Sequence, residues 1–262
     1  MKLSVSNIGW SYDNLEYVIP ILKFNGINYI DVAPSLLHDK NKPINIEEVN
    51  KFYLNNDIKF AGMQSLFFNA PNISIFDGDD NKLILNKYLE NNCFLAKNFK
   101  IQNLVFGSPK NRIINDFNKF TLQRAKNIYK ELSDLAKQYS CILCLEPNPK
   151  EYGCNFITNT FEAIEFVKSI NSPNLKINLD ISTTILNNED LDLIFKLGKE
   201  HIQHVHISAP YLTDITELDH ENIIRILNKY QYSGYIVMEC LFKNNSLFDL
   251  EKNIKCFVKN YR

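Results

Sequence analysis

The stretch Leu175-Lys176-Ile177-Asn178-Leu179-Asp180 carries the pattern from which the fold follows. Side chains on a strand alternate between its two faces, so the three aliphatic residues would point one way and Lys176, Asn178 and Asp180 the other. An apolar face would suit covering helices. The opposite face is polar and ends on an acid, which indicates a strand whose inner side leads to a site.

Similar short apolar runs recur along the chain and alternate with segments of helical period, some of which begin at a capping pattern such as Asn159 with Glu162. Strands that alternate with helices pair in parallel through crossover connections. Eight such units average roughly 33 residues, which predicts a (β/α)8 TIM barrel, a single domain over 1–262. The open doubly wound sheet is the alternative, but Asn7-Ile8-Gly9-Trp10 is not the glycine-rich phosphate turn it usually carries. The predicted strands are 3–8, 29–32, 60–64, 103–106, 142–146, 175–180, 202–207 and 235–239; the predicted helices are 13–25, 46–55, 80–98, 117–139, 159–169, 189–199, 219–230 and 246–260.

Composition excludes several classes of protein. The 29 Lys and Arg residues against 30 Asp and Glu leave a net charge of -1, which argues against nucleic acid or an anionic membrane as the main partner. The N-terminus turns polar too early for a signal peptide, and no apolar run reaches the roughly 18–20 residues of a membrane span. We therefore expect a cytoplasmic protein. Its six cysteines, including Cys141 and Cys144 on opposite faces of one strand, are interpreted as structural thiols.

Four consecutive late strands end on ionisable residues, namely Glu146, Asp180, the pair His204 and His206, and Glu239. In a TIM barrel the chemistry is built at these carboxyl ends. A single Glu there is often a cap or loop charge, and a single His often packs in the core, but four together favour a shared site. Three converging carboxylates repel one another unless a cation neutralises them. Mostly oxygen ligands with one imidazole suit Mn²⁺, Mg²⁺ or Co²⁺.

These residues resemble the sugar phosphate isomerase/epimerase family, the xylose isomerase-like TIM barrels that include ketose 3-epimerases and hydroxypyruvate isomerases. The resemblance implies one divalent metal ion held by Glu146, Asp180, His206 and Glu239, with the two Glu residues as catalytic acid and base. His204 would support the site, face the substrate or simply pack. The matching runs are Leu145-Glu146-Pro147-Asn148-Pro149, Asn178-Leu179-Asp180, His204-Val205-His206 and Met238-Glu239.

Departures from the family pattern bear on the substrate. Ketose 3-epimerases carry a His where this chain has Thr183, an Arg where it has Leu212 and a Glu where it has Tyr152. Those side chains usually touch the sugar, so a different substrate is expected. Endonuclease IV, in the same fold, needs more His ligands for three zinc ions than this chain supplies. Xylose isomerases bind a second metal, but Asp214 and Glu217 do not reproduce that acidic pattern, so one ion is expected.

Such a site supports proton transfer next to a carbonyl. The metal would stabilise an enediolate while Glu146 and Glu239 act as base and acid. Action on opposite faces of the substrate gives epimerisation, and action on one face gives aldose–ketose isomerisation; both stay open. An inosose-dehydratase-like lyase and a non-catalytic barrel used for binding are the alternatives.

The expected partner is a small sugar or sugar phosphate, and the resemblance implies a homodimer or homotetramer. Lys110 and Arg112 lie in a loop that would either grip a phosphate or carboxylate or form a solvated basic turn. Asn155 is a weaker polar candidate. The residues predicted to bind substrate are Gln64, Lys110, Arg112, Asn148, His204 and Trp10.

Overall fold

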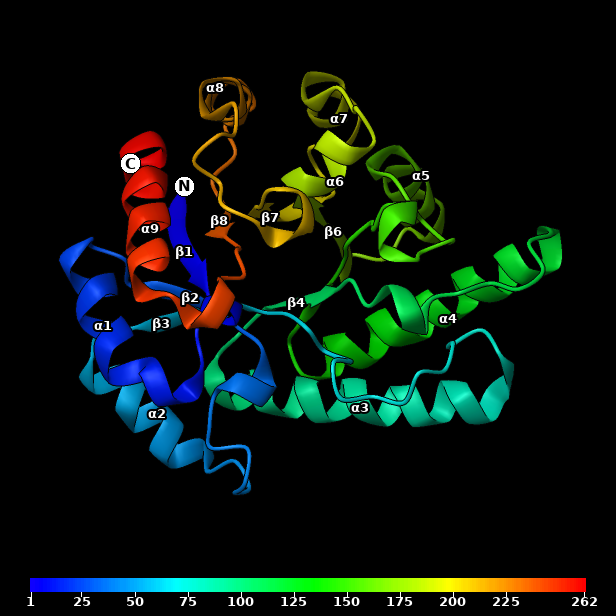
Figure 1. Cartoon of the computed structure of the whole chain (residues 1–262). Coiled ribbons are helices and arrows are strands. Elements are labelled where there is room, and N and C mark those ends of the chain that lie inside the picture. Colours follow the sequence, from blue (N-terminus) through cyan, green and yellow to red (C-terminus); the bar gives the residue numbers. More distant parts are fainter.

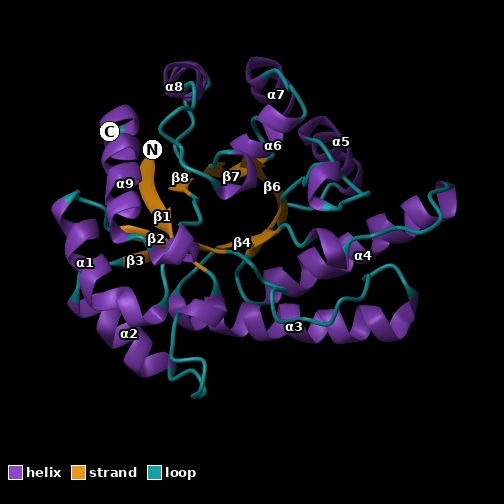
Figure 2. Cartoon of the chain, in the orientation of Figure 1, coloured by secondary structure: helices purple, strands orange, loops and turns teal.

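The computed structural model describes the backbone of residues 1–262 and every side chain except that of Asn245. Eight strands form a closed parallel barrel in chain order, and the first pairs with the last (Figure 2). This confirms the predicted (β/α)8 barrel. The strands are β1 (Lys2–Ser6), β2 (Tyr29–Val32), β3 (Lys59–Met63), β4 (Asn103–Phe106), β5 (Ile142–Leu145), β6 (Leu175–Asp180), β7 (Ile202–Ile207) and β8 (Tyr235–Met238).

The predicted strand limits agree closely with these bounds. β2, β4, β6 and β7 match residue for residue, β5 and β8 each end one residue earlier, and β3 is shifted by one residue at both ends. β1 differs most, because Asn7–Gly9 forms a 3-10 turn in which the Ser6 side chain accepts a hydrogen bond from the amide of Ile8.

Helices surround the barrel, and both termini lie on the same side of it (Figure 1). Each predicted helix is present, and α6 is an additional one that the sequence did not reveal. β6 passes directly into α6, where Asp180 caps the helix by accepting from the amide of Ser182. The helices are α1 (Leu15–Phe24), α2 (Ile46–Asn55), α3 (Gly78–Phe99), α4 (Lys119–Gln138), α5 (Thr160–Ile170), α6 (Ile181–Leu186), α7 (Leu191–Gly198), α8 (His220–Lys229) and α9 (Leu247–Tyr261).

The two faces of the strands differ in chemistry. Leu175, Ile177 and Leu179 are fully buried in the hydrophobic core, as alternation predicts. The inner face instead buries polar groups, among them Asp31 and Asn103. The barrel therefore contains a hydrogen-bonded polar column where many barrels have layers of aliphatic side chains.

Two further expectations concern the whole chain. All six cysteines are unpaired, and only Cys256 is more than slightly exposed. Among the described residues, none of the helices combines the length and apolar character that crossing a bilayer requires.

Candidate metal centre

Two carboxylates and an imidazole meet at the carboxyl end of the barrel. His206 Nδ1 lies 3.1 Å from Glu239 Oε2 and 3.3 Å from Glu146 Oε1. The ligand atoms of these three residues lie within 4.8 Å of one another. The His206 side chain is 1% exposed, whereas Glu146 and Glu239 keep 14% and 10% of theirs, so the carboxylates can be reached from the mouth.

Asp180, the fourth predicted ligand, lies outside this group of three. Its carboxylate accepts hydrogen bonds from the Ser182 amide (2.9 Å), the Thr183 hydroxyl (3.3 Å) and the Ser208 hydroxyl. Burial, together with the charges of Glu146 and Glu239, raises its pKa to about 7. The carboxylates thus repel one another at short range, which a cation between them would relieve.

The charges of Glu146 and His206 stabilise each other. Burial by itself would raise the pKa of Glu146, but its hydrogen bond and charge interaction with His206 hold that pKa below its ordinary value. Burial opposes protonation of His206, yet Glu239, Asp31 and Glu146 together raise its pKa well above the ordinary value. In the metal-free protein a protonated imidazole therefore provides the positive charge.

Three side-chain amides hold the two Glu carboxylates in place. Asn178 Nδ2 donates to Glu146 Oε1 at 2.6 Å, Asn148 Nδ2 donates to Glu146 Oε2 at 3.3 Å, and Gln64 Nε2 donates to Glu239 Oε1. The amide oxygens of these three residues are buried and lack a hydrogen-bond partner among the described side chains. They are therefore buried acceptors that these contacts leave unpaired.

Gly107, directly after β4, makes room for this arrangement. A β-carbon at this position would collide with Glu146 Oε2 and approach the side chain of Asn148. Only glycine leaves room for the carboxylate in its present position. No sequence motif predicted this requirement.

Beneath the cluster lies a second group, formed by His204, which the sequence analysis named, and Asp31, which it missed. Asp31 and His204 are fully buried, and Asp31 Oδ2 lies 2.7 Å from His204 Nε2 and 3.7 Å from His206 Nε2. The signal was available, because Asp31 is a lone acid on the inward face of the otherwise apolar β2. Burial opposes the charge of Asp31, but His204 and His206 still lower its pKa.

Residues 21–259 match the family model described as xylose isomerase-like TIM barrel. The chain belongs to this family. No curated protein matches its sequence.

Solved structures of other proteins superpose on nearly the whole of this xylose isomerase-like barrel. A 3-keto-D-glucoside 4-epimerase from E. coli superposes with a TM-score of 0.80 at 16% identity, covering 99% of each chain. A D-psicose 3-epimerase from Clostridium cellulolyticum H10, solved with D-tagatose, gives 0.77 at 16% identity over 98% of this chain and 90% of its own. The IOLI protein with a bound zinc atom gives 0.76 at 17% identity over 99% and 96%. At such identities the similarity shows the fold.

Two expected substrate contacts require correction in this xylose isomerase-like barrel. His204 has no exposed surface and is bonded within the column, so of the three expected roles it can support the site or pack but cannot face a substrate. Arg112 is also fully buried and donates to the backbone oxygens of Glu146 (3.0 Å) and Phe156 (3.2 Å). It braces the backbone beside Glu146 and is not free to grip an anion.

The other residues expected to contact the substrate differ in the exposure and bonding of their side chains. Lys110 is exposed on the same turn and is the remaining cation there. Trp10 is 2% exposed in the hydrophobic core, so it does not form an open wall. Asn155 bonds the backbone of Ile114 in both directions, a structural role in the loop. Gln64 and Asn148 lie at the site, where their side-chain amides donate hydrogen bonds to the Glu carboxylates.

A hydrogen-bonded relay leads from the rim to Asp180. The amide of Tyr211 donates to the Tyr152 hydroxyl (2.9 Å), which lies 3.1 Å from Ser182 Oγ, and this in turn lies 3.2 Å from Asp180 Oδ2. Tyr211 and Leu212 both adopt positive φ, 60° and 58°, a strained conformation for non-glycine residues. The Tyr152 bond is one of the contacts that stabilise this strained turn.

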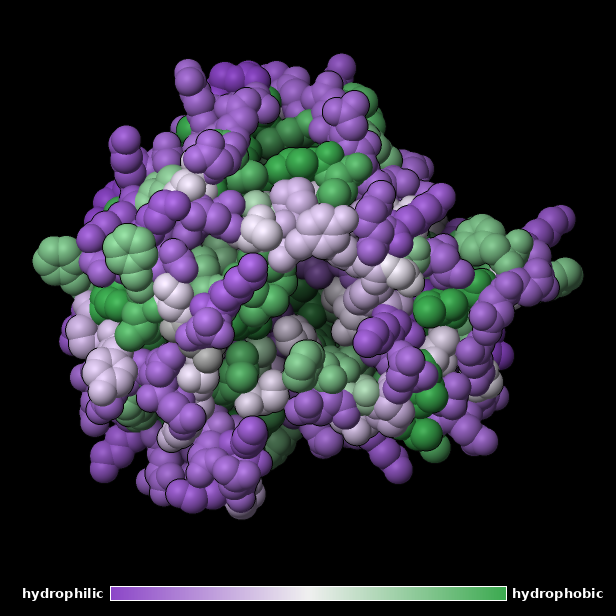
Figure 3. Space-filling model, viewed as in Figure 1, coloured by the Kyte–Doolittle hydropathy of each residue, from purple (hydrophilic) through white to green (hydrophobic). Residues whose placement is uncertain are grey.

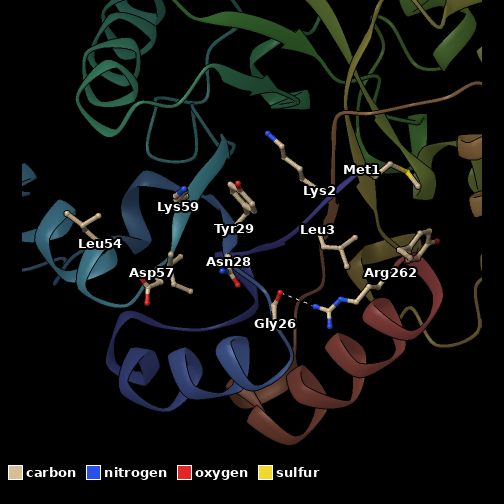
Figure 4. Close-up of a pocket in the computed structure, with 12 residues that line it drawn as sticks. Met1, Lys2, Leu3, Gly26, Asn28, Tyr29, Leu54, Asp57, Lys59 and Arg262 are labelled. Atoms are coloured by element: carbon tan, nitrogen blue, oxygen red, sulfur yellow. Dashed lines mark hydrogen bonds between the residues drawn. The ribbon is translucent and has the colours of Figure 1, made fainter.

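The surface agrees with the position of the site. Figure 3 shows a hollow near the centre of the face seen in Figure 1, with hydrophilic and hydrophobic residues inside it. A separate cavity of about 800 Å³ lies at the opposite end of the barrel, where β1, β2 and β3 begin (Figure 4). None of the four predicted metal ligands lines that cavity.

Proposed function

We propose that this protein is a divalent-metal-dependent epimerase or isomerase that moves a proton beside the carbonyl of a sugar or sugar derivative. The observation that carries the proposal is the meeting of the Glu146 and Glu239 carboxylates at His206 Nδ1, next to Asp180. The similar folds named as a 3-keto-D-glucoside 4-epimerase and a D-psicose 3-epimerase support it.

The residues fit a divalent cation. Two carboxylates meet one imidazole nitrogen, and the pKa of the neighbouring Asp180 is raised by burial and by the charges of these carboxylates. Glu146, Asp180, His206 and Glu239 would hold the ion, and the oxygen-rich donor set favours Mn²⁺, Mg²⁺ or Co²⁺. A bound cation supplies a Lewis acid that stabilises negative charge on the substrate's oxygens.

The side chains supply the proton transfers. Glu146 and Glu239 approach from β5 and β8, two strands separated by β6 and β7, and therefore reach the site from different sides. One removes the proton beside the carbonyl and the other returns one to the opposite face, which inverts that carbon. Gln64 and Asn178 fix the carboxylate positions, which lowers the reorganisation that proton transfer requires.

The residues at the rim of the site favour a substrate other than that of the ketose 3-epimerases. The Thr183 hydroxyl is committed to the oxygen of Pro147 (3.0 Å), and Leu212 offers no polar group where the family implies an Arg. With Arg112 bonded internally, Lys110 is the cation left in its loop for a phosphate. We therefore favour an unphosphorylated sugar or keto-sugar.

Deuterium exchange tests the function directly. Metal-loaded protein is incubated in D₂O with ketoses, ketose phosphates and 3-keto-glucosides, and NMR follows deuterium at the carbons beside the carbonyl. Exchange with a retained carbon skeleton supports the proposal, whereas loss of water indicates a lyase. No exchange with any compound, together with no bound metal by elemental analysis, overturns it.

A further inference from the structure

A further cavity, here called the α2 cavity, lies on the α1 and α2 side of the barrel (Figure 1). It has a volume of about 560 Å³ and is formed by residues 12–16 after β1, residues 37–45 after β2 and residues 48–53 of α2. Volumes of this size are typical of small-molecule sites. We propose that the α2 cavity binds an aliphatic polyamine through the hydroxyl of Tyr53 and the carboxylates around it. This inference goes beyond the proposed function and does not depend on the metal centre.

A buried hydroxyl without a partner is the first observation that points to a ligand. Tyr53 lines the α2 cavity and is 2% exposed, and its hydroxyl forms no hydrogen bond with any described residue. The ring is held by edge-on packing against Phe52 and Phe60, with ring centroids 5.2 Å and 5.0 Å away. Burial and the Tyr12 phenol of the same cavity raise the pKa of Tyr53, so its hydroxyl stays neutral. Because an unpaired buried hydroxyl is costly, a ligand that supplies the missing bond is favoured.

His38 presents a second unpaired atom in the same cavity. Its Nδ1 is buried and has no hydrogen-bond partner among the described residues. An imidazole nitrogen without a proton accepts hydrogen bonds, as does the hydroxyl oxygen of Tyr53. An ammonium group carries three N–H donors and no acceptor. Amine groups therefore match the two unpaired atoms.

The charges that line the α2 cavity select a cation. Asp13, Glu16 and Glu48 form no ion pair among the described residues. Asp39 also lines the cavity, but its carboxylate lies 3.7 Å from the ammonium of Lys42, the one Lys or Arg of the lining. Three carboxylates are thus left without a counter-charge. Their combined field repels phosphates and carboxylates and attracts amines.

An organic cation fits the α2 cavity better than a metal ion does. Within the described part of the chain, the His, Cys, Asp and Glu groups close enough to share a metal lie inside the barrel and include no residue of this cavity. Tyr12 and Phe52 line the cavity and are 41% and 39% exposed. Their rings can cover an alkyl chain or face an ammonium group. Acids beside aromatic rings match the alternating amines and methylenes of an aliphatic polyamine.

Calorimetry of the full chain with spermidine tests the proposal. We expect binding that weakens as NaCl is added, because the contacts are between charges and are screened by salt. The neutral compound 1,4-butanediol is the control ligand and should not bind. No heat of binding with spermidine at millimolar concentrations overturns the proposal. Loss of metal binding or of deuterium exchange, which would overturn the proposed function, leaves this measurement unaffected.

Two pairs of variants locate the bound spermidine. Y53F removes the unpaired hydroxyl, breaks no hydrogen bond in the folded chain and should weaken spermidine about tenfold. Its matched control is Y129F, since Tyr129 is a buried tyrosine whose hydroxyl is also unpartnered but which does not line the α2 cavity. Y129F should bind as the wild type does, and thermal melting checks that both variants fold.

The second pair keeps the test decisive if Y53F does not fold. E48Q should weaken spermidine about threefold, because it removes one exposed carboxylate from the lining. E47Q changes the exposed neighbour on α2 that lies outside the lining and should leave the affinity unchanged. Wild-type affinity in a folded Y53F, or equal losses in E48Q and E47Q, overturns the proposal.

Discussion

Gly107 follows β4 and Glu146 follows the adjacent strand β5, and the glycine leaves the space that the Glu146 carboxylate occupies. The carboxylate is hydrogen-bonded by Asn178 and Asn148 and faces His206 Nδ1, so it has little freedom to move aside. The position of this catalytic candidate therefore depends on the absence of a side chain at residue 107.

G107A should displace the Glu146 carboxylate and weaken metal binding. Because the added methyl group meets a polar side chain and not backbone, we expect the fold to survive with a loss of about 1–3 kcal/mol of unfolding free energy. Calorimetry with Mn²⁺ and denaturant unfolding measure the two effects. Wild-type metal affinity in G107A would show that the carboxylate moves freely.

E239Q should abolish deuterium exchange while the protein remains folded. The amide keeps the size of the side chain but can neither accept a proton nor offer an anionic ligand. NMR in D₂O measures the exchange, and circular dichroism with thermal melting checks the fold. E151Q, an exposed residue of the turn after β5, is the control and should retain full exchange. Substantial activity in E239Q would refute the acid/base role.

The stability of the metal-free protein should depend on pH through Asp180. Its pKa is raised from 3.8 to about 7 in the folded state, so folding favours the protonated form. The contribution of this group to the unfolding free energy is full below about pH 4 and is lost as the pH rises to about 7. Urea unfolding of wild type and D180N should show the wild type losing stability relative to D180N between about pH 4 and pH 7.

Added Mn²⁺ should reverse that trend for the wild type, because binding displaces the proton and strengthens as the pH rises. A difference between wild type and D180N that stays constant with pH, with or without metal, would contradict the assignment of Asp180 to the charged cluster.

R112M should act on stability and not on recognition of an anion. It leaves the backbone oxygens of Glu146 and Phe156 without their donors, at an expected cost of about 2–4 kcal/mol. Denaturant unfolding measures this, with the exposed Lys110 changed to Ala as the control that should stay within about 0.5 kcal/mol. A selective rise in KM for phosphorylated substrates, at unchanged stability, would restore the anion-binding role.

Y152F should loosen the strained turn at the rim. It removes the hydroxyl between the Tyr211 amide and Ser182 but keeps the aromatic contact, whose ring centroids lie 5.7 Å apart. Hydrogen exchange of the Tyr211 amide should become about tenfold faster. Y230F removes a hydroxyl bonded far from the site and is the matched control. Unchanged exchange at Tyr211 in Y152F would show that other contacts hold the turn.

Much of the fold could be predicted because its signals are local. β6 and β7 were located residue for residue from alternation of apolar and polar side chains. The helix α6 was missed because it begins directly after Asp180, the last residue of β6, with no loop to mark the change from strand to helix period. The capping role of that acid is visible only when the backbone after it turns.

The sequence by itself determined the barrel and the convergence of Glu146, His206 and Glu239, because alternation along parallel strands places such residues on the inner face at one end. Only the tertiary structure decided what those side chains contact. Arg112 bonds a backbone oxygen 34 residues away, and Asp31 bonds His204 across 173 residues. The alternation of side chains along a strand repeats every two residues and can be recognised locally. Which side chains meet across a closed barrel depends instead on register, burial and the empty space left by a glycine.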